Sequence, residues 1–182
     1  MDKFFPTEDY KIPTVSNYMK FQEGENTFRV LSSAIIGYEY FNQDNKPVKS
    51  REPFDEMPAD IKKDGRINHF WAFVVWNYEA KRIQILELTQ KGIMKVMQSY
   101  IKNPKWGNPR EYDFIVSRTG SGLDTEYTTA VNPKSELSQE VEDKYNKMTI
   151  NLDALFTGKD PFGKSEKGDT PETPVGADDI GF

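Results

Sequence analysis

The chain of 182 residues contains no cysteine and a single histidine, His69. Disulfides and thiol nucleophiles are therefore excluded, and a zinc site would have to be built almost wholly from carboxylates. No apolar run approaches the roughly 20 residues that span a bilayer, and the N-terminus lacks the pattern of a signal peptide. These absences predict a soluble, intracellular protein with no metal and no cofactor.

Positive charge is outnumbered overall, since 24 Lys and Arg stand against 29 Asp and Glu and the net charge is −5. Its distribution is uneven. Residues 46–118 carry 14 Lys and Arg against 9 Asp and Glu, whereas residues 1–45 carry 4 against 7 and residues 159–182 carry 3 against 6. The middle of the chain is therefore basic, and both ends are acidic.

The basic middle contains a long aromatic hairpin. Residues 66–78 are rich in aromatic and β-branched side chains, and a second apolar run covers residues 82–89, which predicts two paired strands. Alternation along the first strand puts Trp71 and Phe73 on one face and Trp76 and Tyr78 on the other. We expect one face to close a core and the other to remain a platform on which flat ligands stack, with Trp71 and Phe73 favoured for the platform.

The flanking segments complete a small β-rich domain. Residues 26–41 predict a long first strand, with Gly37 as a possible bulge, and residues 90–103 predict an amphipathic helix ended by Pro104. Two further strands, 111–119 and 123–131, are joined by a glycine turn. Five strands with a helix between the third and fourth indicate a mainly β protein with the oligonucleotide-binding (OB) fold, a five-stranded Greek-key barrel. A different small α+β barrel is the alternative.

The remaining segments have distinct compositions. Residues 1–25 read as an N-terminal arm that packs on residues 26–133, the predicted OB-fold domain, or that mediates assembly. Within that domain, residues 42–64 combine three prolines with five Lys and Arg, which predicts a loop over a binding cleft or a disordered insertion. Residues 134–158 predict a helical extension, and residues 159–182 predict a disordered acidic tail.

Four runs of the sequence are informative together: FRVLSSAIIGYEYF, HFWAFVVWNY, IQILELTQKGI and YDFIVSRTGSGLDTEYT. They resemble the single-stranded-DNA-binding proteins of tailed bacteriophages. The tail ADDIGF is similar to the acidic tip of bacterial single-stranded-DNA-binding proteins, with Gly181 in place of a proline. The resemblance implies an OB-fold, a role in phage DNA replication, recombination and repair in the cytoplasm of an infected bacterial cell, and recruitment of replication and repair proteins through Asp178, Asp179, Ile180 and Phe182.

A protein that coats single-stranded DNA without strong sequence preference needs aromatic faces for the bases and cations for the phosphates. Candidate stacking residues are Trp71, Phe73, Trp76, Tyr78, Tyr38, Tyr40, Trp106 and Tyr112, although several of them must fill the core. Candidate phosphate contacts are Lys46, Lys49, Arg51, Lys62, Lys63, Arg66, Lys81, Arg82, Arg110 and Arg118. His69 reads as a polar edge residue.

Two other classes of function remain open at this point. Asp113, Asp124 and Glu126 are carboxylates that could serve a metal-dependent nuclease, although such residues on strands are usually solvated. The aromatic strands could instead form a protein interface, which would make the chain an interaction module.

Overall fold

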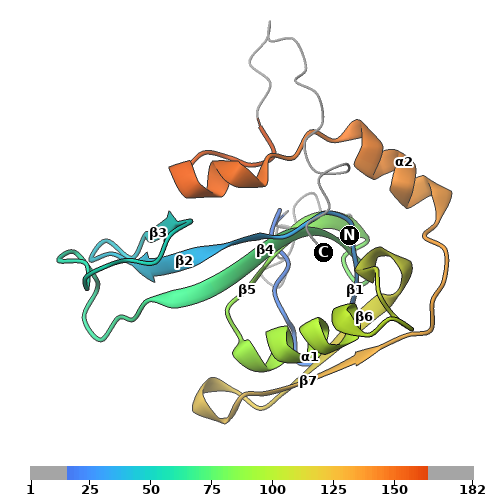
Figure 1. Cartoon of the computed structure of the whole chain (residues 1–182), viewed down its shortest axis with the longest axis horizontal. Coiled ribbons are helices and arrows are strands. Elements are labelled where there is room, and N and C mark those ends of the chain that lie inside the picture. Colours follow the sequence, from blue (N-terminus) through green and yellow to red (C-terminus); the bar gives the residue numbers. More distant parts are fainter. Residues whose placement is uncertain (1–15, 164–182) are drawn as a thin grey trace, which may run out of the picture.

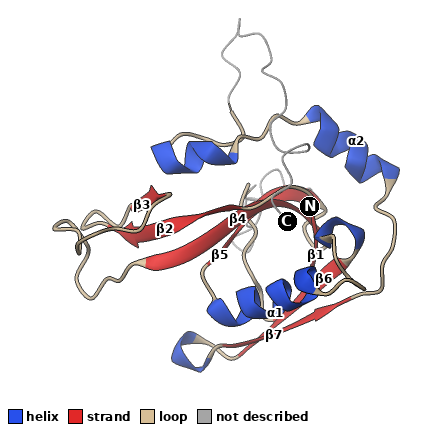
Figure 2. Cartoon of the chain, viewed as in Figure 1, coloured by secondary structure: helices blue, strands red, loops and turns tan. Residues whose placement is uncertain are grey.

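The structure is a computed structural model that describes residues 16–163. It is mainly β, as predicted, with few helices (Figures 1 and 2). Its strands are β1 (Gly24–Val30), β2 (Ile35–Phe41), β3 (Pro47–Ser50), β4 (Asn68–Asn77), β5 (Arg82–Leu88), β6 (Asp113–Thr119) and β7 (Glu126–Val131). Its helices are α1 (Lys91–Lys102), α2 (Gln139–Lys147) and the short 3-10 helices η1 (Pro109–Glu111), η2 (Gly122–Asp124) and η3 (Leu152–Thr157). None of the described helices is long and apolar enough to cross a membrane.

Strand β4 is the centre of the antiparallel sheet. One of its edges pairs with β5 over its last seven residues. The other edge pairs with β1 near Val75 and with β2 near Ala72. The strand predicted over residues 26–41 is therefore divided in two. Between Val30 and Ile35 the chain takes five steps while β4 takes three, so two extra residues break the strand.

The sheet is open within the described residues. Its order is β3-β2-β4-β1-β6-β7, with β5 on the other edge of β4. A closed five-stranded barrel is not seen, because β7 pairs only with β6. The outer edge of β5 is instead occupied by residues 17–19: Ile85 N–H donates to the Asn17 carbonyl, and Met19 N–H donates to the Ile85 carbonyl, both at 2.9 Å. The N-terminal segment thus takes hydrogen bonds that a closing strand would need.

One face of β4 looks into the main core. Phe73 and Val75 are completely buried there against Phe28, Leu86 and Phe114. Helix α1 closes this core with Ile93, Met94 and Met97, which recur on one side of the helix. The methionines therefore fill the core, and Phe73 is not the platform residue that the alternation of the strand suggested.

The opposite face of β4 is covered as well, which corrects the expectation of one open face. Phe70, Ala72, Val74 and Trp76 lie under the extension that follows β7 (Figure 1). The apolar residues that the extension contributes are Leu137, Val141, Tyr145, Met148, Ile150, Leu152, Leu155, Phe156 and Phe162. Both faces of β4 are therefore core over most of the strand.

Gly37 illustrates how closely this cover packs. The pairing of β2 with β4 is continuous through Gly37, so the predicted bulge is absent there. A Cβ atom at this position would lie 2.5 Å from the Ser50 carbonyl oxygen and 2.9 Å from the Phe156 ring. Glycine is needed for the close approach of β3 and η3, and not for a bend.

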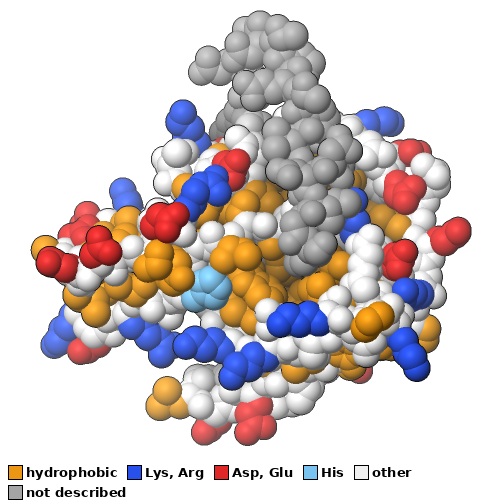
Figure 3. Space-filling view, viewed as in Figure 1, with side chains coloured by type: hydrophobic (Ala, Val, Ile, Leu, Met, Phe, Trp, Pro, Cys, Tyr) orange, Lys and Arg blue, Asp and Glu red, His pale blue; other side chains and the backbone are white. Residues whose placement is uncertain are grey.

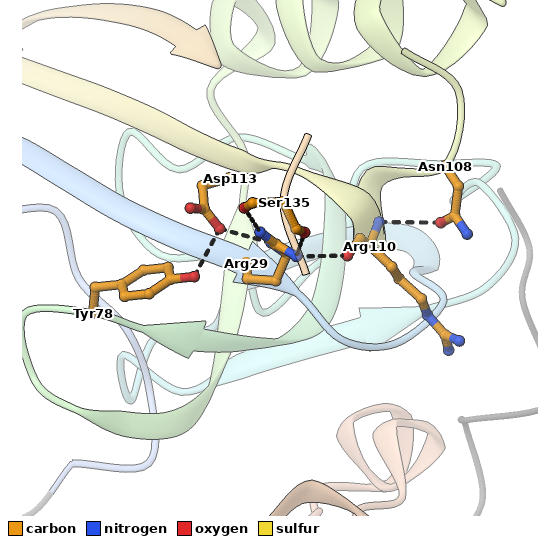
Figure 4. Close-up of polar contacts among 6 residues, drawn as sticks. All are labelled: Arg29, Tyr78, Asn108, Arg110, Asp113 and Ser135. Carbon is orange, nitrogen blue, oxygen red and sulfur yellow. Dashed lines mark hydrogen bonds and ion pairs between the residues drawn. The ribbon is translucent and has the colours of Figure 1, made fainter. Parts of the chain in front are cut away.

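A buried arginine joins the sheet to the extension (Figure 4). Arg29 Nε donates to Asp113 Oδ1 at 2.7 Å, and its Nη atoms donate to the carbonyl oxygens of Arg110 and Ser135 and to Ser135 Oγ at 2.9–3.0 Å. Asp113 Oδ1 also accepts the Tyr78 hydroxyl at 2.9 Å. Because the Arg29 side chain is only 1% exposed, its charge depends on these partners.

We expect Asp113→Leu to destabilise the fold strongly. It leaves the always-charged guanidinium of Arg29 buried without a counter-ion, which costs about 3–5 kcal/mol. Urea unfolding followed by circular dichroism measures the loss. The matched control is Glu111→Leu, which breaks the exposed pair with Lys134 (3.2 Å) and should cost less than about 1 kcal/mol. Equal effects of the two substitutions would contradict a structural role for the Arg29 cluster.

Candidate nucleic-acid interface

The start of β4 runs beyond the main core and forms, with β2, β3 and the loop between β3 and β4, an arm that projects from the body (Figure 1). On this arm Tyr38 is paired with His69 and Ile36 is paired with Trp71. The rings of Tyr38 and His69 are 5.2 Å apart, and Ile36 is 54% exposed. We call Ile36, Tyr38, His69 and Trp71 the arm patch. Figure 3 shows hydrophobic side chains gathered along the arm above a row of Lys and Arg.

A pocket of about 790 Å³ adjoins the arm patch. It lies where the arm meets the start of α1, and its lining residues are Tyr38, Pro53, Phe54, Arg66, Ile67, Asn68, His69, Thr89, Gln90 and Lys91. We call it the arm pocket. Its volume falls in the range of small-ligand sites. The loop of residues 42–64 borders it through Pro53 and Phe54, and hydrogen bonds such as Lys62 N–H to the Phe41 carbonyl (2.9 Å) return that loop to the end of β2.

The predicted stacking residues are dispersed by the fold. Tyr38 and Trp71 lie together in the arm patch. Phe73 and Tyr112 are completely buried, and Tyr40 and Trp76 are 6% and 8% exposed. A buried ring offers no face to a base, so these four are no longer candidates. Trp76 lies under the extension with Lys144 over its ring.

Trp106 and Tyr78 serve other contacts. Trp106 stands edge-on between Tyr100 and Tyr112, with ring centroids 5.4 and 5.3 Å away, at the far end of α1. Tyr78 belongs to the Arg29 cluster through its hydroxyl. Neither residue lies at the arm.

Half of the predicted phosphate-binding cations are already engaged. Lys49 is buried between Glu39 (3.0 Å) and Glu87 (3.6 Å), and burial raises the pKa of Glu87. Arg51 pairs with Asp153 and lies 4.3 Å over the Phe156 ring. These two cations hold the arm to the rest of the fold, so we do not keep them as DNA contacts.

Three more cations have contacts with the protein itself. Lys62 lies 5.2 Å over the Phe41 ring, and Arg118 donates to the Phe21 carbonyl at 3.0 Å. The Arg110 backbone belongs to the Arg29 cluster, while its side chain is directed away from Arg29 (Figure 4). Lys62 remains exposed on the arm, whereas Arg110 and Arg118 lie on and beside β6, away from the arm pocket.

The side chains of the other five cations make no hydrogen bond or ion pair with residues 16–163. They are Lys46, Lys63, Arg66, Lys81 and Arg82. Lys46, Lys63 and Arg66 belong to the arm. Lys81 and Arg82 belong to the turn at the other end of β4, eight strand positions from His69, which is roughly 26 Å. Of these five, Arg66 lines the arm pocket beside Tyr38 and His69, whereas Lys46 and Lys63 lie elsewhere on the arm.

Phe54, His69, Gln90 and Lys91 are site residues that the sequence did not single out as ligand contacts. Phe54 stands in a proline-rich loop, and Gln90 and Lys91 begin a helix, so no strand pattern marked them. For His69 the signal was available, because it alternates with Trp71 on the same face of β4.

The carboxylates considered for a nuclease are not gathered. Asp113 is the counter-ion of Arg29 at one end of β6, whereas Glu126 pairs opposite Thr119 at the other end, six positions or roughly 20 Å away. Within residues 16–163 there is no group of three His, Asp or Glu able to hold a metal ion. The three carboxylates thus cannot share one metal.

Two predicted features lie outside the described residues. They are the partner-binding tip, Asp178, Asp179, Ile180 and Phe182, and most of the N-terminal arm. Residues 16–25 are the described part of the N-terminal arm, and they include the segment that pairs with β5.

Tyr78 gives this structure a measurable dependence on alkaline pH. Burial, followed by the hydrogen bond to Asp113, raises its pKa to about 12, and burial likewise raises the pKa of Tyr112 to about 12. Unfolded tyrosine loses its proton near pH 10. Between these values the unfolded chain releases protons that the folded chain retains, so the unfolding free energy falls as pH rises.

We therefore expect stability to be level up to about pH 9 and to fall between about pH 10 and 12. Urea midpoints across this range measure the fall. Tyr78→Phe should be less stable at pH 8, because it loses the hydrogen bond, and should show a shallower alkaline decline. An unchanged decline in Tyr78→Phe would contradict the contribution of this hydroxyl.

The chain was compared with three groups of known proteins. No protein-family model, no curated protein and no solved structure matches it, so no family is assigned.

Proposed function

We propose that the protein binds single-stranded DNA through the arm, coating and protecting it during phage replication, recombination and repair. The observation that carries this proposal is the arm patch beside cations that have no partner in residues 16–163. Aromatic faces next to unpaired Lys and Arg are what an unpaired strand requires, because its bases stack while its phosphates need counter-charge.

The order of elements supports an OB-type domain for this role. β1 with β2, then β4 and β5, then α1, then β6 and β7 follow the order of five OB strands with the helix after the third. In this proposal β1 and β2 are the two halves of the first strand, and β3 is an insertion in the loop after it. OB domains bind oligonucleotides near that loop and the face of the second and third strands. The arm pocket adjoins both.

Duplex DNA fits this surface poorly. Its phosphates would meet the same cations, but its bases are stacked on one another and cannot reach Tyr38 or Trp71. Phosphate contacts contribute to the binding free energy of both forms of DNA, whereas stacking contributes only to that of the single strand. The proposal therefore requires a preference for single strands that persists when salt weakens the phosphate contacts.

The tip of the tail completes the proposal. Asp178, Asp179, Ile180 and Phe182 would recruit replication and repair proteins, as the resemblance of ADDIGF implies. Acidic and apolar side chains placed next to one another suit a small apolar pocket with a basic rim.

We expect Trp71 to report the binding of oligo(dT). It is the tryptophan of the arm patch, whereas Trp76 is covered by the extension and Trp106 lies at the far end of α1. The double variant Trp76→Phe with Trp106→Phe should keep the fluorescence quenching on titration, and Trp71→Phe should lose most of it. If the quenching were lost in the double variant and kept in Trp71→Phe, the DNA would bind elsewhere on the protein. No binding by any assay would favour a protein-interaction module.

We expect Arg66→Gln to weaken binding to oligo(dT) and to make the negative slope of log affinity against log salt shallower by about 1. Arg82→Gln is the matched control, because Arg82 also lacks a partner in the described residues but lies at the other end of β4. With oligonucleotides just long enough to bind, Arg82→Gln should leave the slope unchanged. Equal slopes for the two variants would contradict a binding site on the arm.

A further inference from the structure

The arm pocket has polar side chains that the protein leaves unpaired. Within residues 16–163, the side chains of Arg66, Asn68 and Lys91 make no hydrogen bond or ion pair. His69 Nδ1 is buried and has no hydrogen-bond partner there. Buried polar atoms are normally paired, so the unpaired Nδ1 is unusual, while Arg66 and Lys91 are exposed donors that a ligand in the pocket can reach.

The walls of the arm pocket suit a flat, unpaired base. Tyr38 and His69 are opposed across β2 and β4 with ring centroids 5.2 Å apart, and Phe54 lines the pocket from the loop. Phe54 is itself held edge-on against Tyr40 at 5.2 Å. Aromatic side chains from three segments thus line this pocket of about 790 Å³.

The charged lining of this pocket is wholly cationic, since Arg66 and Lys91 are present and no Asp or Glu is. The α1 N-terminus that enters it has no acidic residue in its first turn, and Gln90 gives it no side-chain cap. A second pocket, of about 630 Å³ beneath α2, is lined by Glu111, Glu136 and Glu142 together with Arg110. Its lining has an excess of negative charge, so of these two pockets the arm pocket is better suited to a nucleotide.

The polar lining is also rich in donors. Arg66 and Lys91 can only donate hydrogen bonds. The Gln90 oxygen already accepts from Thr89 N–H at 3.2 Å, and this leaves its NH₂ group as a donor. Asn68 and His69 can each donate or accept a hydrogen bond. Such a lining favours a ligand edge that presents acceptors.

We infer that the arm pocket takes one unpaired nucleobase of the bound strand and prefers bases with a carbonyl oxygen at C4 of a pyrimidine or C6 of a purine, thymine, uracil and guanine, over cytosine and adenine, which carry an amino group there. Thymine and guanine present the acceptors O4 and O6 where cytosine and adenine present amino donors. An amino group facing Arg66 and the Gln90 NH₂ would place donor against donor. This inference rests on the proposed function and adds base selection to it.

The test compares strands that differ at this edge of the base, in the group at C4 or C6 and in the proton on the neighbouring ring nitrogen. Oligo(dU) and oligo(dC), each of about 12 nucleotides, form one pair, and oligo(dI) with oligo(dA) forms the other. We expect the full chain to bind oligo(dU) and oligo(dI), the members with O4 or O6, about 3–10-fold more tightly, which corresponds to one additional hydrogen bond per occupied pocket. Fluorescence anisotropy of labelled strands at moderately high salt measures the ratio.

The NMR signals of the single histidine, His69, report whether the bound base lies in the arm pocket. Its imidazole C–H signals are unique in a proton–carbon NMR spectrum of this chain, and they should shift on addition of oligo(dU). Gln90→Leu should bring the dU to dC ratio towards 1. Gln98→Leu is the matched control, because Gln98 is an exposed residue of α1 outside the pocket and should keep the ratio. Circular dichroism melting establishes that both variants fold.

The outcomes separate the two proposals. Tight binding to every strand with equal affinities would overturn the base preference and leave single-strand binding intact. A preference that survives in Gln90→Leu, or an unmoved His69 signal in the bound state, would overturn the assignment to this pocket. Failure to bind any strand would overturn the proposed function, and the base preference with it.

Discussion

The structure depends on one constraint, which is that β4 is apolar on both faces and must be buried on both. Phe73 and Val75 point into one core, and Phe70, Val74 and Trp76 point into another. Leaving either face open would expose several large side chains, each worth roughly 1.5–3 kcal/mol when buried. The sheet with α1 covers the first face. The second face needs the extension after β7, and the Arg29 cluster ties the start of that extension to β1 and β6.

The candidate interface arises where this double cover ends. Helix α1 begins at Lys91, three residues after Leu88, which pairs with Trp71. The main core therefore ends near Trp71, whereas β4 begins three residues earlier, at Asn68. The extension does reach the arm on the other face, where Phe156 contacts Phe70. The arm is thus supported from one side and accessible from the other. That combination gives a rigid platform, which costs less conformational entropy on binding than a free loop would.

Much of the local structure could be predicted from the sequence. Helix α1 was expected over residues 90–103 and spans Lys91–Lys102, and β4, β5, β6 and β7 lie within their predicted ranges. These elements follow from periodicities of neighbouring residues. Partners far apart in the chain could not be predicted in this way. Arg51 and Asp153 are 102 positions apart, and Arg29 and Asp113 are 84 apart. Their pairing removes one predicted phosphate contact and one predicted metal ligand, and only the fold reveals it.

The same argument resolves the conflict between a net charge of −5 and a proposal of DNA binding. What attracts a phosphate is the charge left over at a given place after internal pairs are made, because screening limits the reach of the rest to about 10 Å. Lys49 is neutralised by Glu39 and Glu87, and Arg29 is neutralised by Asp113, so they contribute little to the field outside. Arg66 and Lys91 keep their charge at the arm pocket, beside Tyr38 and His69, where no Asp or Glu lines the wall. Cations alone would attract duplex and single strands alike, and in the proposed function the adjacent rings would turn this attraction into a preference for unpaired bases.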